Sequence, residues 1–246
     1  MTKKKVKINY EKLIFNFVFI TLLLSFVALT IIIYKAPDIA TEEGMRVKSD
    51  YSLMLSQSVL GVIAMMLPSF ISKKIQIKIP SGMMLLYVLF LYGAIYLGEV
   101  KAYYYNVPHW DTMLHAFSGA MLGALGFSFV SLLNKSETIS FRLSPLFVAL
   151  FAFCFAIMLG VAWEVYEYTF DGLWGLNMQK FMTEDGREFI GRAALKDTMK
   201  DLIVDAVGAF VMSAIGFISL KYKTKFIQSI QIKTTKYRKK KSNETI

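Results

Sequence analysis

The chain has 246 residues, of which 55% are hydrophobic and 19% are charged, and its formal net charge is +10. Too little polar surface is available to cover a water-soluble globule of this size, so the composition excludes an ordinary soluble domain and indicates a membrane protein. The single cysteine, Cys154, excludes an intramolecular disulfide. We therefore expect one all-α membrane domain over residues 1–246.

Six apolar segments each have close to the roughly 20 residues that a helix needs to cross ~30 Å of hydrocarbon. They predict transmembrane helices at residues 13–34, 51–71, 83–100, 112–133, 145–163 and 198–220. The first follows the basic start MTKKKVK, which is typical of a signal peptide. Its apolar run is longer than signal peptides carry, and no small-residue cleavage pattern follows. We expect it to be retained as a helix.

Lysine and arginine residues indicate how these helices are oriented, because they resist translocation across the membrane. They gather in the tail 1–12, in the connection 72–78, at Lys135 and Arg142, and in the tail 221–246. An even number of spans places all four groups, and both termini, on the cytoplasmic side. We expect the two basic tails to contact anionic lipid headgroups and not nucleic acid, because they adjoin apolar helices.

This topology divides the chain into a first group of three helices (13–100) and a motif-bearing part with three more (101–220). The connections 35–50, 101–111 and 164–197 then face outward. The last of these is long enough to carry a small lid or an interfacial helix.

Acidic residues and both histidines gather at the outward ends of the last four predicted helices. The set consists of Glu99, His109, Asp111, His115, Glu164, Glu167, Asp171, Asp197, Asp201 and Asp205. Within three of these helices the members are three or four residues apart and therefore share a helix face. The deepest of them, Asp205, is expected well inside the hydrocarbon, where a carboxylate is unfavourable unless it is paired, protonated or hydrated.

A bound cation would balance these carboxylates. The basic residues near the same face are few, namely Lys101, Arg187, Arg192, Lys196 and Lys200, and the deeper parts of the four helices have none. Imidazoles with carboxylates suit Zn²⁺, Mn²⁺ or iron, whereas carboxylates with water suit Mg²⁺ or Ca²⁺. In the alternative interpretation, Asp111 and Asp197 only cap helices, and the acidic residues at 164–171 are solvated beyond the membrane.

Small residues predict that the fourth and sixth helices pack closely. Gly119 and Gly123 lie four apart in the fourth helix, and Gly208 and Gly216 lie eight apart in the sixth. Such faces let helix backbones approach each other in a membrane. Close contact there would bring His115 toward Asp201.

Three stretches resemble the YjdF-like bacterial inner-membrane proteins, an uncharacterised family. They are HWDTMLHAFSGAMLGA (109–124), LGVAWEVYEYTFDGLWG (159–175) and DTMKDLIVDAVGAF (197–210). The Asp-x-x-x-His-x-x-x-Gly part of the first also resembles, more weakly, the VanZ-like membrane proteins. The resemblance covers roughly residues 95–220. It implies a multi-pass protein of the bacterial plasma (inner) membrane and supplies neither a substrate nor a reaction.

The motifs of the family fall on residues that the helical spacing also selects. By position, His-x-Asp-x-x-x-His falls on His109, Asp111 and His115, Glu-x-x-Glu on Glu164 and Glu167, and Asp-x-x-x-Asp on Asp197 and Asp201. Asp205 departs from the pattern, in which a small residue is expected. This departure weakens the case that Asp205 is essential.

Our working hypothesis is an outward-facing polar pocket in a metal-dependent enzyme that acts on a lipid or lipid-linked envelope molecule. Its divalent metal would be Zn²⁺, Mn²⁺ or Mg²⁺. The ligands would be Asp111, His115, Glu164, Asp197 and Asp201; the catalytic residues Glu167, as general base, and His109; and the further polar residues Glu99, Asp171 and Asp205. A proton- or cation-coupled transporter and a non-catalytic structural or partner-binding protein are the alternatives.

Overall fold

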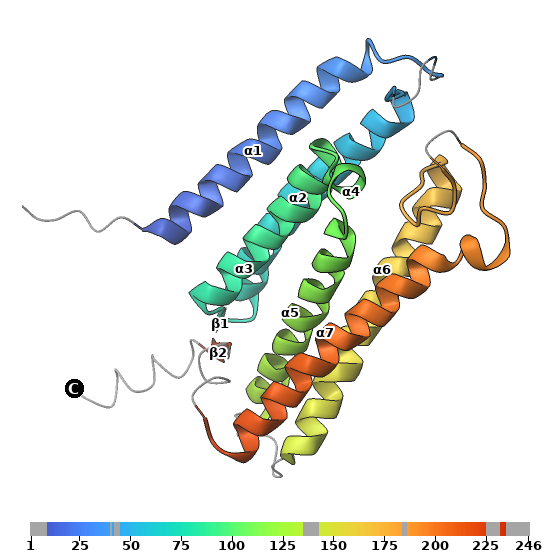
Figure 1. Ribbon diagram of the computed structural model, residues 1–246. Coiled ribbons are helices and arrows are strands. Elements are labelled where there is room, and N and C mark those ends of the chain that lie inside the picture. Colours follow the sequence, from blue (N-terminus) through green and yellow to red (C-terminus); the bar gives the residue numbers. More distant parts are fainter. Residues whose placement is uncertain are drawn as a thin grey trace, which may run out of the picture.

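The computed structural model describes residues 9–39, 41, 45–134, 143–183, 186–224 and 232–234. They form a helical bundle (Figure 1), which confirms the all-α membrane fold. Within this part of the chain, six helices are long and apolar enough to cross a membrane. These are α1 (Tyr10–Ile33), α2 (Lys48–Lys74), α3 (Ser81–Leu91) with its continuation η1 (Tyr92–Val100), α5 (Trp110–Asn134), α6 (Pro145–Trp174) and α7 (Lys196–Lys221).

Short elements lie at the two ends of the bundle. The helical turns α4 (Tyr103–Asn106) and η2 (Gly191–Ala193) lie in two of the connections. Strand β1 (Ile77–Lys78) pairs antiparallel with β2 (Lys233–Thr234), which ties the α2–α3 connection to the chain after α7. Lys135, Arg142 and most of both basic tails lie outside the described residues.

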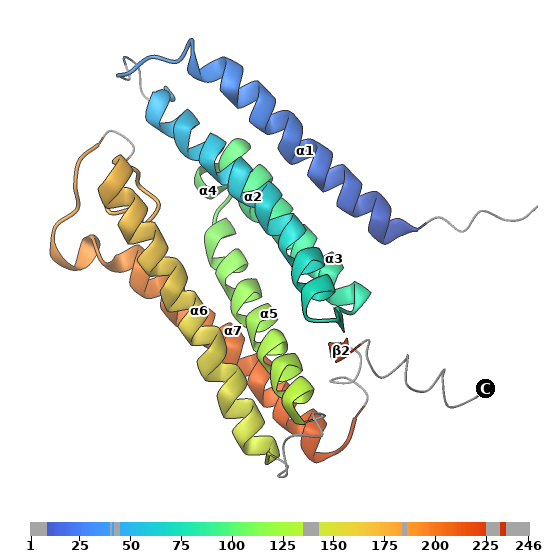
Figure 2. The same ribbon diagram turned by 180° about the vertical axis from the view of Figure 1, so that it is seen from behind.

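The connections alternate between the two ends, as the sequence predicts. The α1–α2 connection, α4 and the α6–α7 connection lie at one end, which we call the site end, and β1 and β2 lie toward the other (Figures 1 and 2). The same views show two groups of helices, α1–α3 and α5–α7. Each group has its own apolar core, one around Leu22, Met65 and Val88 and the other around Phe127 and Ala152.

Helices α5 and α7 pack with their backbones in close approach, which confirms the prediction from the small residues. A Cβ atom added to Gly119 would collide with the backbone of Asp205, and one added to Gly208 would collide with the backbone of Ala116. No side chain fits at either glycine without separating the helices. The two contacts bring the first turns of α5 opposite the first turns of α7.

Helix α6 is longer than the apolar segment that predicts it. It continues from residue 163 to Trp174 and ends at Gly175, whose φ of 63° and N–H bond to the Asp171 carbonyl form a left-handed cap. The polar residues of this last stretch retain good helix-forming side chains, so loss of hydropathy does not end the helix. The connection is therefore 175–195, and the interpretation of Glu164 and Asp171 as solvated loop residues is wrong, because both are buried.

Candidate metal centre

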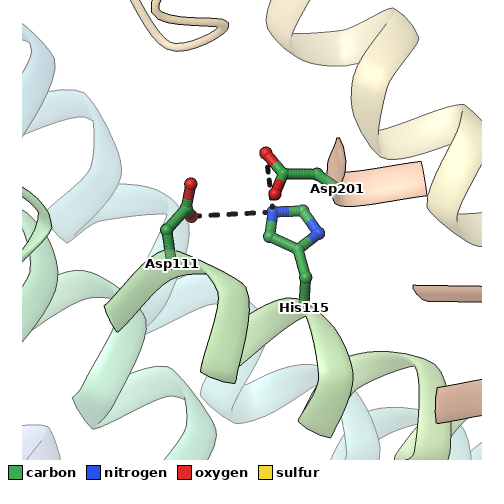
Figure 3. Close-up of side chains that lie close together, drawn as sticks. All are labelled: Asp111, His115 and Asp201. Atoms are coloured by element: carbon green, nitrogen blue, oxygen red, sulfur yellow. Dashed lines mark ion pairs between the residues drawn. The ribbon is translucent and has the colours of Figure 1, made fainter. Parts of the chain in front are cut away.

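One histidine and two aspartates meet between α5 and α7 near the site end. Asp111 and His115 lie one turn apart on α5, and Asp201 faces them from α7 (Figure 3). One ligand atom from each side chain lies within 4.8 Å of the other two. His115 Nε2 is 3.7 Å from Asp111 Oδ1 and 3.8 Å from Asp201 Oδ2. The helical spacing and the predicted contact of His115 with Asp201 are both realised.

The other ring nitrogen of His115 contacts a third carboxylate. Nδ1 lies 3.3 Å from Asp205 Oδ2, and the Ser118 hydroxyl donates to Asp205 Oδ1 at 2.9 Å. In the tautomer with Nδ1 protonated, Asp205 Oδ2 accepts a hydrogen bond from Nδ1–H, and Nε2 is the nitrogen that faces the two ligand carboxylates. A carboxylate that orients a histidine in this way is the usual outer partner of a metal-bound imidazole. Asp205 thus contacts the centre directly, although it departs from the family pattern.

Space for the Asp205 carboxylate comes from a glycine on the third helix. A Cβ atom on Gly160 of α6 would lie 2.8 Å from Asp205 Oδ2. Together with the close approach at Gly119, this gap lets a charged side chain fit where α5, α6 and α7 meet. The sequence gives no signal for it, because Gly160 lies in an uninterrupted apolar run.

The atoms around His115 Nε2 satisfy a simple test for a cation site. The two distances are too long for hydrogen bonds, and ligands of a metal ion at about 2.1 Å are separated by about 3.4 Å in tetrahedral geometry. Asp201 is 2% exposed, and its second oxygen, Oδ1, is buried without a hydrogen-bond partner among the described residues. A buried carboxylate oxygen in this state is unfavourable unless the group is protonated or a cation is bound nearby. The side chains therefore fit a divalent metal.

A lysine closes the centre from the α6–α7 connection. Lys180 pairs with Asp111 Oδ2 and lies 3.3 Å from Asp197 Oδ2, with its ammonium 5.6 Å from the centre of the Tyr104 ring. Burial lowers the pKa of Lys180, but the Asp111 and Asp197 carboxylates more than offset it, so the pKa is raised and the side chain stays charged. Sequence reasoning missed Lys180, because no periodic pattern covers a connection of this kind.

Asp171 holds this connection against the helices. Its carboxylate accepts the backbone N–H groups of Met178 at 2.8 Å and Gln179 at 3.0 Å. The Gln179 amide in turn donates to Thr198 at 2.9 Å and to Glu164 Oε2 at 3.4 Å. Asp171 is thus bonded to backbone groups, and its contacts position Lys180 over the centre.

The remaining predicted residues lie around the centre or outside it. Asp197 pairs with Lys180 instead of joining the three-residue group, and Glu167 accepts a bond from the Trp163 indole at 2.9 Å. Glu164 is buried, and its Oε1 has no hydrogen-bond partner among the described residues. Glu99 is the penultimate residue of η1, on the other helix group. His109 precedes α5, is exposed, and has a positive φ of 60°. Among the described residues, none of the contacts of the centre involves its ring.

Comparisons with known proteins agree with the membrane fold. The family model described as "Predicted membrane protein (DUF2238)" matches residues 17–222. An uncharacterised protein of Thermotoga maritima is 29% identical over 121 residues, which cover 49% of this chain and 54% of that protein. The chain thus matches only about half the length of this relative. No solved structure matches the chain. The match over most of the chain, with six helices long enough to span a bilayer, shows a multi-pass membrane protein that belongs to the DUF2238 family.

Proposed function

We propose that this protein binds a divalent metal ion between Asp111, His115 and Asp201 and uses it to transform a lipid or lipid-linked molecule. One observation carries the proposal: Nε2 of His115 faces two carboxylate oxygens while Nδ1 is engaged by Asp205. An Nε2 lone pair that points at two anionic oxygens is unfavourable unless a proton or a metal cation lies between them. A metal ion fits this position with all three side chains as ligands.

The charges of the centre support a cation of this kind. Four aspartates, at 111, 197, 201 and 205, lie within ion-pairing distance of His115 or Lys180. Lys180 balances only one of the four carboxylates. Carboxylates at this depth in a bilayer require further compensation, which a divalent ion provides.

The ligand types narrow the choice of metal. Imidazole nitrogen favours Zn²⁺ or Mn²⁺ over Mg²⁺, which prefers oxygen ligands and keeps most of its water. A bound metal of this class polarises a phosphate or ester oxygen and lowers the pKa of a coordinated water. Glu164 and Glu167 lie three residues apart on α6 and are the candidate proton acceptors, with Glu167 as the general base of the original hypothesis.

The position of the centre suits a substrate from the membrane. Asp201 and Asp205 lie five and nine residues into α7, which places them about 8 and 14 Å along the helix from its start. The entrance of the centre is therefore near the lipid headgroups and its floor is in the hydrocarbon. Esters and phosphates of lipids, or of lipid-linked envelope molecules, lie at the depth of this entrance.

The narrower assignments belong to the same proposal. The three motifs indicate the YjdF-like group within the family, and the Thermotoga maritima relative supports a bacterial protein. The charge pattern then orients the site end outward across the inner membrane, with the basic tails at anionic headgroups on the cytoplasmic side.

Ion-coupled transport is the second function that these carboxylates support, and the deeper half of the bundle argues against it. Helix α5 has no charged residue after Asp111, α6 has none before Glu164, and α7 has none between Asp205 and Lys221. Transport sites of this kind lie near the middle of the bilayer and are reached from both sides. A site confined to one end favours binding and catalysis.

Metal content of the purified protein tests the proposal. We expect close to one Zn²⁺ or Mn²⁺ per chain after loading and gel filtration, and a loss of at least tenfold in Asp201→Asn. Asp197→Asn is the matched control, because Asp197 lies one turn away on the same face but pairs with Lys180. It should retain metal. Equal metal content in all three proteins, each monodisperse in detergent, would overturn the proposal.

A further inference from the structure

In the α6–α7 connection, the described residues 175–183 and 186–195 have one side on the metal centre and another side exposed. We call these residues the lid segment. Its inner side carries Lys180 and is held by the Asp171 carboxylate. In Figure 1 it is the orange trace beside the site end of α6 and α7. Any molecule that reaches the centre from this side passes the lid segment.

The exposed side of the lid segment carries apolar side chains whose contact with water is unfavourable. Ile190 is 91% exposed and Leu195 is 60% exposed. At the adjoining end of α6, Leu173 is 69% exposed and Trp174 is 57% exposed. Helix α6 has 30 residues, more than the roughly 20 that cross the hydrocarbon, so its end at Trp174 is expected at the level of the lipid headgroups. The covering medium at this level is the lipid interface, where aromatic and aliphatic side chains beside polar ones are stabilised.

Basic side chains accompany these apolar ones. Arg192 lies in η2 and Lys196 begins α7, and both are exposed on either side of Leu195. Glu188, an exposed acidic residue among the described ones of this connection, precedes Arg192 by four residues, and its backbone forms an isolated β-bridge with that of Met182. A pair of cations next to inserted aliphatic side chains complements the phosphate groups of anionic lipids.

We propose that the lid segment is an interfacial element that holds the phosphate of an anionic lipid at Arg192 and Lys196, with Ile190 and Leu195 in the acyl boundary. It recruits such lipids from the leaflet at the site end. This binding is distinct from the contact of the basic tails with lipids of the opposite leaflet. The bound phosphate lies at the entrance that Lys180 closes. The surface depends on the fold and on the bilayer, and not on metal in the centre.

A fluorophore on the lid segment tests this arrangement. Cys154 is the only cysteine, so Cys154→Ala with Ile190→Cys gives one labelling position. In vesicles of phosphatidylcholine with phosphatidylglycerol, bromine is placed on the acyl chains of one lipid or the other at equal fractions. We expect quenching by both, with the brominated phosphatidylglycerol enriched at the label about fivefold for each basic residue that contacts it.

Two double variants of the labelled protein show which basic residues cause the enrichment of phosphatidylglycerol at the label. Arg192→Gln with Lys196→Gln should equalise the quenching by the two lipids. Lys73→Gln with Lys74→Gln removes the same charge from the opposite end of the bundle and should leave the enrichment unchanged. Absence of quenching by either lipid, or equal quenching before any charge is removed, would overturn the proposal. Metal content, measured in the same samples, should stay constant, which separates this test from that of the metal centre.

Discussion

The two helix groups of the bundle are assembled on different principles. In the described part of α1–α3, the fully buried side chains include Val18, Leu22 and Met65, and the buried polar residues are two serines and one glutamine. In α5–α7, glycines bring the backbones together, and four acidic side chains are buried. A membrane helix group needs only apolar packing to be stable. We therefore propose that the buried acids of the second group serve the function and that the first group is a scaffold for it.

A glycine-to-alanine substitution should show the largest difference between the two helix groups, measured as a loss of unfolding free energy. Gly119→Ala places a methyl group against the backbone of Asp205, which cannot yield without moving α7. Gly61→Ala in α2 meets the end of the flexible Ile95 side chain. We expect Gly119→Ala to cost about 3 kcal/mol of unfolding free energy and Gly61→Ala less than about 1 kcal/mol. Unfolding of both variants in detergent measures the difference, and equal losses would contradict the contrast.

Asp205→Asn should weaken metal binding more than any change in the first helix group. The neutral amide accepts a weaker hydrogen bond from Nδ1–H of His115 than the carboxylate does, so the ring is held less firmly in its orientation. Removal of such an outer partner weakens metal affinity by about 10- to 100-fold. Titration of the variant and of the unmodified protein with Zn²⁺ or Mn²⁺ measures this loss of affinity. Affinity equal to that of the unmodified protein would show that Asp205 is only a packing residue.

Lys180→Met should increase metal affinity, in contrast to Asp205→Asn. The variant removes a cation that competes for Asp111, so we expect metal affinity to rise roughly tenfold. Lys101→Met is the matched control, because Lys101 also lies over a tyrosine ring, that of Tyr96, at 5.6 Å. Lys101→Met should leave the affinity unchanged in the same titration. Weaker binding in Lys180→Met would show that Lys180 supports the metal ligands instead of competing with the ion.

Of these variants, Ser118→Ala should have the smallest effect on metal affinity. It removes one hydrogen bond to Asp205 and leaves the contact of Asp205 with His115 in place. One such bond contributes about 1 kcal/mol, so affinity should fall by about fivefold or less. A loss as large as that of Asp205→Asn, in the same titration, would mean that the hydroxyl has a further role.

Local sequence patterns were sufficient to predict the six spans and part of the centre. Apolar length indicated each helix, and helical spacing placed Asp111 with His115, because both depend only on neighbours along the chain. The predicted contact of His115 with Asp201 also relied on glycines that showed which helices approach. These are properties that a single chain displays without knowledge of its tertiary structure.

Other features depend on tertiary contacts and could not be predicted. The family pattern weakened the case that Asp205 is essential and gave no sign of its contacts. In the structure, Gly160 leaves space for its carboxylate and the Ser118 hydroxyl donates a hydrogen bond to it. Lys180 lies in a connection without periodicity, and its place is fixed by the Asp171 carboxylate. His109 and Asp197 fit the spacing of ligands, yet one is exposed and the other is paired with Lys180.

The most direct test of the metal centre detects the ligand nitrogen itself. The chain has two histidines, so pulsed electron paramagnetic resonance of bound Mn²⁺ distinguishes them through two variants. We expect the coupling of one imidazole nitrogen in the unmodified protein and in His109→Ala, and its loss in His115→Ala. A nitrogen coupling that persists in His115→Ala, or bound Mn²⁺ without any nitrogen coupling in the unmodified protein, would contradict a metal ion held by His115 between Asp111 and Asp201.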